Sequence, residues 1–361
     1  MEMRKMLSGA GSYLQGENIL PALGAELRRR QFRHAFLIAG EKAWAATREG
    51  LEAGLRENEI SFRLKRFSGF CTEEEADAFG AAVREDACDC LVGIGGGKAL
   101  DLTKEVGAQL GLHVFTVPTC AATCAAFAPL SVLYDSEGRM LRNHHHPDEV
   151  QGVIVDTAVL AAAPARYLAS GMADAMAKSC EYSFLRSELR YGDLELSKYL
   201  GYRMALVSDE VLLRIGRQAL EDNRNAQVTD ALEDAVFCTI ASTGIISGMG
   251  GFVRPGGSRF AVAHSFNEIL RGTYVDTRAW LHGELVGVGI LAQHYTNGSP
   301  EEQIRRIERF YRDLSLPVCL SDLGLTLDDQ AFSVFTEEIV RQSKVPEAQA
   351  GRVRLAVAKV R

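Results

Sequence analysis

Short apolar runs alternate with amphipathic segments of helical period through the first half of the chain. The apolar runs fall at 34–40, 60–67, 90–96, 113–118 and 153–157, and helix-period segments lie at 43–56, at 73–86 and between 96 and 113. Alternation of this kind is typical of a parallel sheet with crossover helices. We therefore expect the first half to form an α/β domain built on a parallel sheet.

The pattern changes after residue 157. Strand-like runs nearly disappear, and long amphipathic stretches such as 174–192 and 301–316 follow one another. Pro164 can open the first helix of a new domain. At 361 residues the chain is long enough for two cores. We predict an α/β domain over 1–160 and an all-α domain over 161–361, with Gly248–Gly257 as a loop.

Charge and composition exclude several classes of protein. The net charge is -7, and Lys and Arg are scattered along the chain, so no basic face for nucleic acid or anionic lipid is expected. No apolar run is long enough to span a membrane, and the first residues lack the apolar core of a signal peptide, which predicts a cytoplasmic protein. Eight cysteines without CxxC spacing favour neither a disulfide scaffold nor a thiolate zinc site.

A glycine-rich turn is the strongest local motif. Its residues, 93–101, have the sequence GIGGGKALD. They follow a predicted apolar strand and begin a predicted helix. Glycines there allow the backbone to approach a pyrophosphate, whose charge is stabilised by amides at the helix N-terminus. The spacing matches neither GxGxxG nor GxxxxGK[ST], so the alternative that the turn is glycine-rich for geometry alone stays open.

Four motifs in order carry a family resemblance. GGGKALD (95–101), VPTCAATCAAFAPLSVLY (117–134), SGMADAMAK (170–178) and HGELVGVGIL (282–291) together resemble the iron-containing (group III) alcohol dehydrogenases. Within that family the chain is most similar to the glycerol dehydrogenase-like branch, which includes hydroxycarboxylate dehydrogenases. The resemblance implies an N-terminal NAD(P) domain, a helical C-terminal domain in a dehydroquinate synthase-like architecture, a divalent metal and a homo-oligomer.

The resemblance also implies a set of cofactor-binding residues. The pyrophosphate is expected on Gly96 and Gly97 of the turn, and the remaining positions of the set are Gly95, Lys98, Asp101, Thr119, Thr123, Leu130 and Tyr134. NAD-using members commonly carry a carboxylate where this chain has Gly40, followed by Glu41 and Lys42. Gly40 and Lys42 suit a 2′-phosphate, whereas Glu41 could bond a ribose, so NAD and NADP both remain open.

The same resemblance implies one divalent metal per chain, held by Asp174, His264 and His282. Each histidine by itself would more often be a packed residue than a ligand, but a carboxylate and two imidazoles suit zinc or ferrous iron. Iron-dependent members resemble a pattern with a further histidine one helical turn after the aspartate, where this chain has Lys178. A protonated amine is a poor ligand, which favours zinc, with nickel, manganese or iron as alternatives.

Two positions depart from the glycerol dehydrogenase pattern. Cys124 occupies the place of an aspartate that helps to hold the polyol, which favours an anionic or less polar substrate, although Cys124 could equally be a packing residue. Asn267 replaces a second histidine that usually follows the first metal histidine. Because Asn cannot shuttle a proton, another group or a water chain would relay it, or the activity differs.

The implied activity is reversible hydride transfer between NAD(P) and a small alcohol or 2-hydroxy acid, giving the ketone or 2-oxo acid, with Cys124 beside the metal ligands in the catalytic set. Three alternatives stay open: a glycerol or polyol dehydrogenase, a dehydroquinate synthase-like lyase or cyclase, and a nucleotide- or metal-sensing protein. The run His144-His145-His146 is interpreted as a polar loop, because contiguous histidines do not share one helical face.

Overall fold

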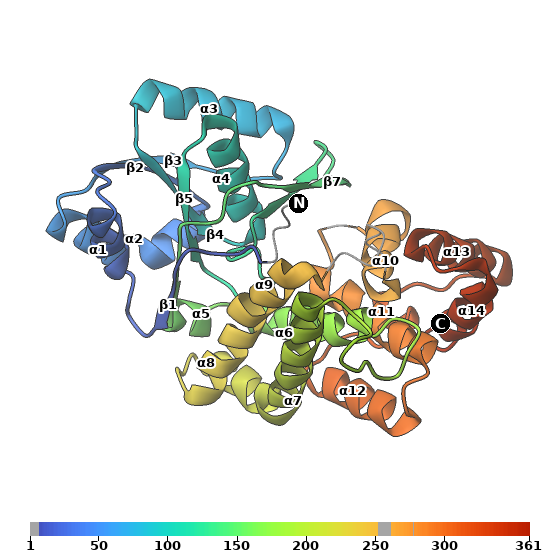
Figure 1. Ribbon diagram of the computed structural model, residues 1–361. Coiled ribbons are helices and arrows are strands. Elements are labelled where there is room, and N and C mark those ends of the chain that lie inside the picture. Colours follow the sequence, from blue (N-terminus) through green and yellow to red (C-terminus); the bar gives the residue numbers. More distant parts are fainter. Residues whose placement is uncertain (1–6, 252–260, 277) are drawn as a thin grey trace. The chain divides into compact units, whose positions relative to one another are not determined.

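The apolar runs of the first half form a six-stranded parallel sheet in the computed structural model, which describes residues 7–251, 261–276 and 278–361. Along the sheet the strand order is β1-β8-β5-β4-β2-β3, and these strands except β8 are labelled in Figure 1. The strands are β1 (Tyr13–Gly16), β2 (His34–Ala39), β3 (Ser61–Arg66), β4 (Cys90–Gly95), β5 (His113–Pro118) and β8 (Gly152–Asp156). The predicted parallel sheet is confirmed, and β1, which the apolar pattern did not indicate, pairs with β8 at its edge.

Helices cover both faces of this sheet. Alternate residues of β2 enter different cores: Leu37 packs with Leu27 and Leu51, while Phe36 packs with Phe79. A strand buried on both faces needs apolar side chains at every position, which explains the unbroken apolar runs. The helices of this part of the chain are α1 (Ala22–Arg29), α2 (Glu41–Glu57), α3 (Glu73–Asp86), α4 (Gly97–Leu110) and α5 (Thr157–Ala161).

A two-stranded antiparallel hairpin, β6 (Leu130–Tyr134) and β7 (Met140–His145), lies beside α4. The interpretation of residues 144–146 as a polar loop is therefore wrong, because His144 and His145 belong to β7 and His144 is opposite Ser131 of β6. Helical spacing was the wrong test for this segment, since residues of a strand share a face at every second position.

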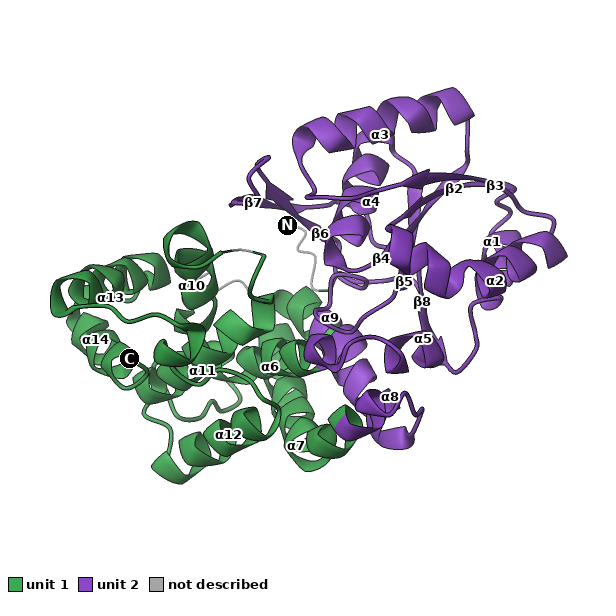
Figure 2. Cartoon of the chain, turned by 180° about the vertical axis from the view of Figure 1, so that it is seen from behind, with its two compact units in different colours: residues 1–7, 169–220, 245–361 green, residues 8–168, 221–244 purple. Residues whose placement is uncertain are grey.

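The chain divides into two compact units (Figure 2). Unit 2 comprises Ser8–Leu168 and Glu221–Gly244, and unit 1 consists mainly of Ala169–Leu220 and Ile245–Arg361. Residues 221–244 join unit 2 through specific bonds: the Asn223 side-chain amide donates to the carbonyls of Leu160 (3.0 Å), Ala161 (2.8 Å) and Ala163 (3.1 Å). The boundary at residue 160 stays a prediction, because a unit defined by contacts need not fold on its own.

Within 161–361 the described residues form helices and turns without strands, so the predicted α/β-then-α fold class is confirmed. The α-helices are α6 (Ala165–Tyr182), α7 (Leu196–Arg224), α8 (Asp230–Phe237), α9 (Thr243–Ile246), α10 (Val262–Ile269), α11 (His282–Asn297), α12 (Glu301–Asp313), α13 (Asp329–Ser343) and α14 (Ala350–Ala358). Short π or 3₁₀ segments are η1 (Cys238–Ser242), η2 (Ser247–Gly251), η3 (Leu270–Tyr274), η4 (Ser321–Leu323) and η5 (Glu347–Gln349).

Two details of the helical half differ from the sequence-based expectation. The stretch 174–192 is not one helix, because α6 ends at Tyr182 and Leu185 adopts φ 62°. The glycine-rich segment predicted as a loop begins as the π segment η2, and its residues 252–257 lie outside the described residues. Among the helices that the structure describes, none combines the length and the apolar character needed to cross a bilayer.

Candidate functional site

The glycine-rich turn joins β4 to α4, and its glycines differ in what the backbone requires. Gly95 has φ 146°, which L side chains rarely adopt, and an added Cβ would lie 3.2 Å from the Ala99 Cβ. A Cβ on Gly96 or Gly97 would find its nearest neighbour at 3.5 or 3.6 Å, which is ordinary contact. No side chain caps α4 and its first turn holds no acidic residue, so the positive helix end suits an anion.

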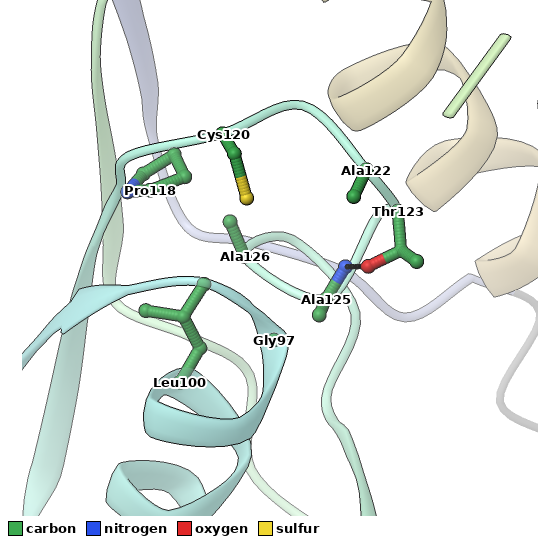
Figure 3. Close-up of a pocket in the computed structure, with 8 residues that line it drawn as sticks. All are labelled: Gly97, Leu100, Pro118, Cys120, Ala122, Thr123, Ala125 and Ala126. Atoms are coloured by element: carbon green, nitrogen blue, oxygen red, sulfur yellow. Dashed lines mark hydrogen bonds between the residues drawn. The ribbon is translucent and has the colours of Figure 1, made fainter. Parts of the chain in front are cut away.

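Loop 119–126 lies next to the first turn of α4, and the two line a small pocket (Figure 3). The Thr119 amide donates to the Gly95 carbonyl at 3.1 Å, and the Thr123 hydroxyl accepts from the Ala125 amide at 3.3 Å. Gly97 and Thr123, both predicted to bind cofactor, therefore share this pocket. Its lining residues are Gly97, Leu100, Pro118, Cys120, Ala122, Thr123, Ala125 and Ala126.

Asp101 lies on the next turn of α4 and is 6% exposed. Its Oδ1 is 2.9 Å from the Lys104 Nζ, and its Oδ2 accepts from the Val132 amide at 3.1 Å. Burial raises the pKa of Asp101, although Lys104 opposes that effect. Lys104 also donates to the carbonyls of Ala125 at 2.8 Å and Leu130. The buried pair thus fastens the loop and β6 to α4, so Asp101 contacts protein groups that position the pocket.

Lys98 and Tyr134 meet around an aromatic side chain that the sequence analysis did not identify. The Lys98 ammonium lies 3.8 Å from the Phe70 ring centroid, and the Phe70 and Tyr134 ring centroids are 5.4 Å apart. Phe70 precedes α3 in a turn, where a single aromatic residue gives no sequence signal. The geometry nevertheless brings Lys98 and Tyr134 together beside the glycine turn.

Gly40 and Glu41 lie at the carboxyl end of β2. Gly40 has φ −68°, and an added Cβ would have only the Phe67 carbonyl oxygen near it, at 3.9 Å. Glu41 pairs with Arg66 at 3.1 Å, and Arg66 ends the neighbouring strand β3. Sequence analysis missed Arg66, because pairing between strands is needed to bring it beside Glu41. Charges of both signs therefore lie at this end of the sheet.

Asp174, His264 and His282 come together within unit 1, from α6, α10 and the first turn of α11. The Asp174 Oδ1 lies 3.5 Å from the His264 Nε2 and 3.4 Å from the His282 Nε2, and it is buried without a hydrogen-bond partner. Ligand atoms of a tetrahedral zinc ion are about 3.3 Å apart, because each bond is about 2.0–2.1 Å long. The donor set and its spacing therefore fit a shared divalent metal.

Two glycines of the HGELVGVG segment explain how these helices approach so closely. A Cβ on Gly283 would lie 1.8 Å from the Ser170 carbonyl oxygen of α6, and one on Gly289 would lie 2.4 Å from the Ala263 carbonyl oxygen of α10. The Gly283 amide also donates to the Ser170 hydroxyl at 3.1 Å. Close backbone contact thus brings α11 against both other helices and places His282 beside Asp174.

Glu181 contacts the candidate ligand His264 and was missed by the sequence analysis. Its Oε1 accepts from the His264 Nδ1 at 2.6 Å and from the His264 amide at 3.1 Å, so the ring presents Nε2 to Asp174. Burial alone would lower the pKa of His264, but Glu181 and Asp174 outweigh it and raise the pKa to about 9. Glu181 follows Asp174 by two helical turns, a spacing that could have indicated the shared face.

Comparisons with known proteins agree with this geometry. A family model described as iron-containing alcohol dehydrogenase matches residues 10–157. Glycerol dehydrogenase of Citrobacter freundii is 31% identical over 331 residues, which cover 90% of this chain and 87% of the relative. The chain belongs to the iron-containing alcohol dehydrogenase family.

A second curated relative supports the family, and a solved structure shares the fold. Hydroxycarboxylate dehydrogenase A of Escherichia coli is 33% identical over 301 residues, which cover 83% of this chain and 80% of the relative. The crystal structure of glycerol dehydrogenase from Schizosaccharomyces pombe shares the fold, with a TM-score of 0.86 and 21% identity over 99% of this chain and 91% of that chain.

Membership confirms the predicted oxidoreductase class, since the family is one of NAD(P)-dependent, metal-containing dehydrogenases. The relatives named above are dehydrogenases, which favours this class over the lyase and sensor alternatives of the sequence analysis. The structure adds detail at the positions where this dehydrogenase departs from the pattern. Lys178 is 1% exposed with its Nζ 3.6 Å from the Asp174 Oδ1, and Asn267 is 3% exposed with a buried Oδ1 that has no partner.

Cys124 lies in unit 2, buried in loop 119–126. Its carbonyl accepts from the amides of Phe127 (2.9 Å) and Ala128 (3.0 Å), so it begins a tight turn. These bonds involve only the backbone, so they do not require a particular side chain at position 124. The role of the Cys124 thiol toward substrate stays a prediction.

Proposed function

We propose that Asp174, His264 and His282 hold one zinc ion and that NAD(P) binds at the Gly95–Lys98 turn. Convergence of the three donor groups at 3.4 and 3.5 Å supports the metal site. Lys178, an ammonium in the position of a fourth ligand, supports three-ligand binding and hence zinc. When bound, the metal would polarise the substrate oxygen as a Lewis acid while nicotinamide exchanges the hydride.

We propose further that the substrate is a small 2-oxo acid, or the matching 2-hydroxy acid in the oxidation direction. The buried Lys178 ammonium carries this proposal, because it adds a positive charge beside the ligand set. With a divalent ion, the charges of the metal and Lys178 exceed those of the Asp174 and Glu181 carboxylates by one. Arg271 adds a further positive charge to this field. The pKa of His282 is lowered, first by burial and then by the charges of His264 and Arg271. A substrate carboxylate is stabilised there, whereas neutral glycerol is not.

A polyol dehydrogenase is the second candidate, because several relatives at 30% identity or more are named glycerol dehydrogenases. The two candidates differ in substrate charge, so kinetics separates them. Zinc-loaded protein would be assayed by nicotinamide absorbance with NAD and NADP, against small 2-oxo acids, 2-hydroxy acids, glycerol and neutral diols. We expect the highest kcat/KM with the acids, and a preference for glycerol would contradict the proposal.

Lys178 provides the sharper test. Lys178→Met removes the charge and keeps most of the buried volume, and should lower kcat/KM for the 2-oxo acid about tenfold or more relative to a neutral ketone. Equal losses on both substrates would show that Lys178 has only a structural role. Elemental analysis of the variant checks that the metal is retained.

Cys124 gives an independent prediction. Cys124→Asp introduces the carboxylate found at this position in the glycerol dehydrogenase pattern. We expect kcat/KM for the 2-oxo acid to fall about a hundredfold, since one misplaced charge costs about 3 kcal/mol in a partly dry site, while a neutral diol is little affected. Cys124→Asn is the uncharged control, and a similar loss in both variants would make position 124 a packing residue.

Metal identity is tested by reconstitution. Chelator-treated protein would be reloaded with zinc, ferrous iron, manganese or nickel, and we expect zinc to restore the highest activity. Higher activity with ferrous iron at equal occupancy would contradict the zinc assignment while leaving the three ligands in place.

A further inference from the structure

Unit 2 contains a second cluster of metal-ligating side chains, far along the sequence from the three ligands described above. Glu105 of α4, His144 of β7 and His146 just after it each offer a ligand atom, and these atoms lie within 4.8 Å of one another. We propose that Glu105, His144 and His146 form a second site for a divalent transition-metal ion of the zinc class.

Strand geometry creates this cluster. His144 of β7 and His146, the first residue after that strand, are two residues apart, and their ring centroids lie 4.8 Å apart on one side of the chain. The His144 Nδ1 is 2.9 Å from the Glu105 Oε2, and the His146 Nε2 is 4.0 Å from the same oxygen. Two imidazoles and one carboxylate form a donor set that zinc uses in proteins. Of the three consecutive histidines, His145 is the one left off this face.

Burial favours a compensating cation beside Glu105. The side chains of Glu105 and His146 are only 6% and 4% exposed, and that of His144 is 36% exposed. The neighbouring Lys104 is already held by Asp101 and by backbone carbonyls. A buried carboxylate is costly without a positive partner. A bound divalent ion would supply that positive charge beside Glu105, where the His144 Nδ1 already lies 2.9 Å from the Glu105 Oε2.

The hydrogen bonds of His146 leave a nitrogen for such an ion. Ser131 donates its hydroxyl hydrogen to the Asp101 carbonyl at 2.8 Å, so the Ser131 oxygen accepts from the His146 Nε2 at 2.7 Å. The other ring nitrogen, Nδ1, is buried without a partner. Nδ1 therefore has a lone pair without a partner, and Nε2, 4.0 Å from the Glu105 Oε2, becomes available to an ion only if it gives up its bond to Ser131. An ion bound by His144 and Glu105 would replace the direct contact between the His144 Nδ1 and the Glu105 carboxylate.

An ion there would connect the β6–β7 hairpin to α4, the helix that begins at the glycine turn. The Asp101–Lys104 pair fastens the same two elements one turn earlier. We therefore expect the second ion to stabilise unit 2. This inference concerns residues outside the Asp174 site and does not rest on the proposed substrate.

The test is metal stoichiometry on the intact chain. Chelator-treated protein would be equilibrated with zinc, freed of excess, and measured by elemental analysis together with chain concentration. We expect two ions per chain in the wild type and one in His282→Ala, with the remaining ion lost in His282→Ala combined with His144→Ala. His144 is the most exposed of the three ligands, so this change should leave the fold intact. His145→Ala on the same background is the matched control and should keep its ion.

A second measurement distinguishes loss of the second ion from misfolding of a variant. Cobalt(II) added to His282→Ala should give the visible absorption of a low-symmetry site with nitrogen and oxygen ligands, and Glu105→Gln should remove it while circular dichroism stays unchanged. Zinc should also raise the melting temperature of His282→Ala, but not after His144→Ala. One ion per chain in the wild type, or two retained after His144→Ala, would overturn the proposal.

Discussion

Gly95 and Gly96, neighbours in the glycine-rich turn, are glycines for different physical reasons. Gly95 needs glycine because of its φ of 146°, whereas Gly96 has an ordinary extended conformation with φ −84°. The sequence GGG alone could not distinguish a backbone requirement from space for a ligand. The structure separates the two at adjacent residues, which makes each separately testable.

Alanine at these two positions should give opposite results. Gly95→Ala should destabilise unit 2 by about 1–2 kcal/mol through backbone strain. Gly96→Ala should leave the melting temperature within about 1 °C but weaken NAD(P) binding about tenfold, or about 1.4 kcal/mol, because its Cβ occupies the space beside the helix end. Thermal unfolding and fluorescence titration measure the two effects. Unchanged cofactor affinity in Gly96→Ala would mean that the turn is only structural.

Gly40 allows a test of cofactor choice at a single residue. The fold accepts a side chain there, since only one atom lies within 4 Å of the added Cβ. Gly40→Asp should lower the affinity for NADP about tenfold relative to NAD, because a carboxylate repels the 2′-phosphate. Gly40→Asn, of the same size without charge, is the control. If the ratio of NADP affinity to NAD affinity is the same in Gly40→Asp and Gly40→Asn, the 2′-phosphate does not bind beside residue 40.

At the scale of elements, strands and helices could be predicted more reliably than the contacts between them. The positions of β2, β4 and β5 follow from apolar runs, and Asp174, His264 and His282 follow from family motifs. Glu181 was missed because its partner His264 is 83 residues away. The histidine run was misread because helical periodicity was applied to a segment that pairs as a strand.

Helix α11 contains a buried histidine that should make stability depend on pH. His294 is 4% exposed, its Nδ1 bonds the Ser299 hydroxyl at 2.9 Å, and burial lowers its pKa from 6.5 to about 4. Below pH 6.5 the unfolded chain takes up the proton first, so stability falls as pH drops toward 4, by up to about 1.4 kcal/mol per pH unit.

The variant His294→Asn isolates this effect. Asn at position 294 cannot titrate and can still bond Ser299, so the free energy of unfolding of the variant should fall about 1.6 kcal/mol less than that of the wild type between pH 6.5 and pH 5. Urea unfolding at several pH values measures the difference. Parallel pH profiles for the two proteins would show that His294 is not the responsible group.

On the scale of the whole molecule, the order of an α/β part and a helical part could be read from the chain. The return of residues 221–244 to unit 2 could not, because it depends on contacts such as those of Asn223 with Leu160 and Ala161. Asparagine on a helix has no local pattern that names a partner some 60 residues away. Composition and periodicity predict helices and strands, but they do not predict a hydrogen bond between two segments that are distant in sequence.

Metal removal should destabilise unit 1, because the three proposed ligands come from helices separated by up to 108 residues in sequence. Zinc at a hundred times its dissociation constant should stabilise the fold by about 2.7 kcal/mol. The apparent melting temperature of the wild type should therefore fall on chelation. The part of this fall in melting temperature that comes from the Asp174 site should be absent in His282→Ala, which should also be inactive. If chelation still destabilises unit 1 in that variant, the ligand assignment is wrong.

The discontinuity of unit 2 limits how this protein can be cut and recombined. A gene fragment ending at residue 168 would encode every strand of the large sheet but would lack Asn223, leaving the carbonyls of Leu160, Ala161 and Ala163 without their donor. A transplantable unit 2 must therefore include residues 221–244, either as a fused segment or as a second chain. Chimeras between members of this family should exchange both pieces together.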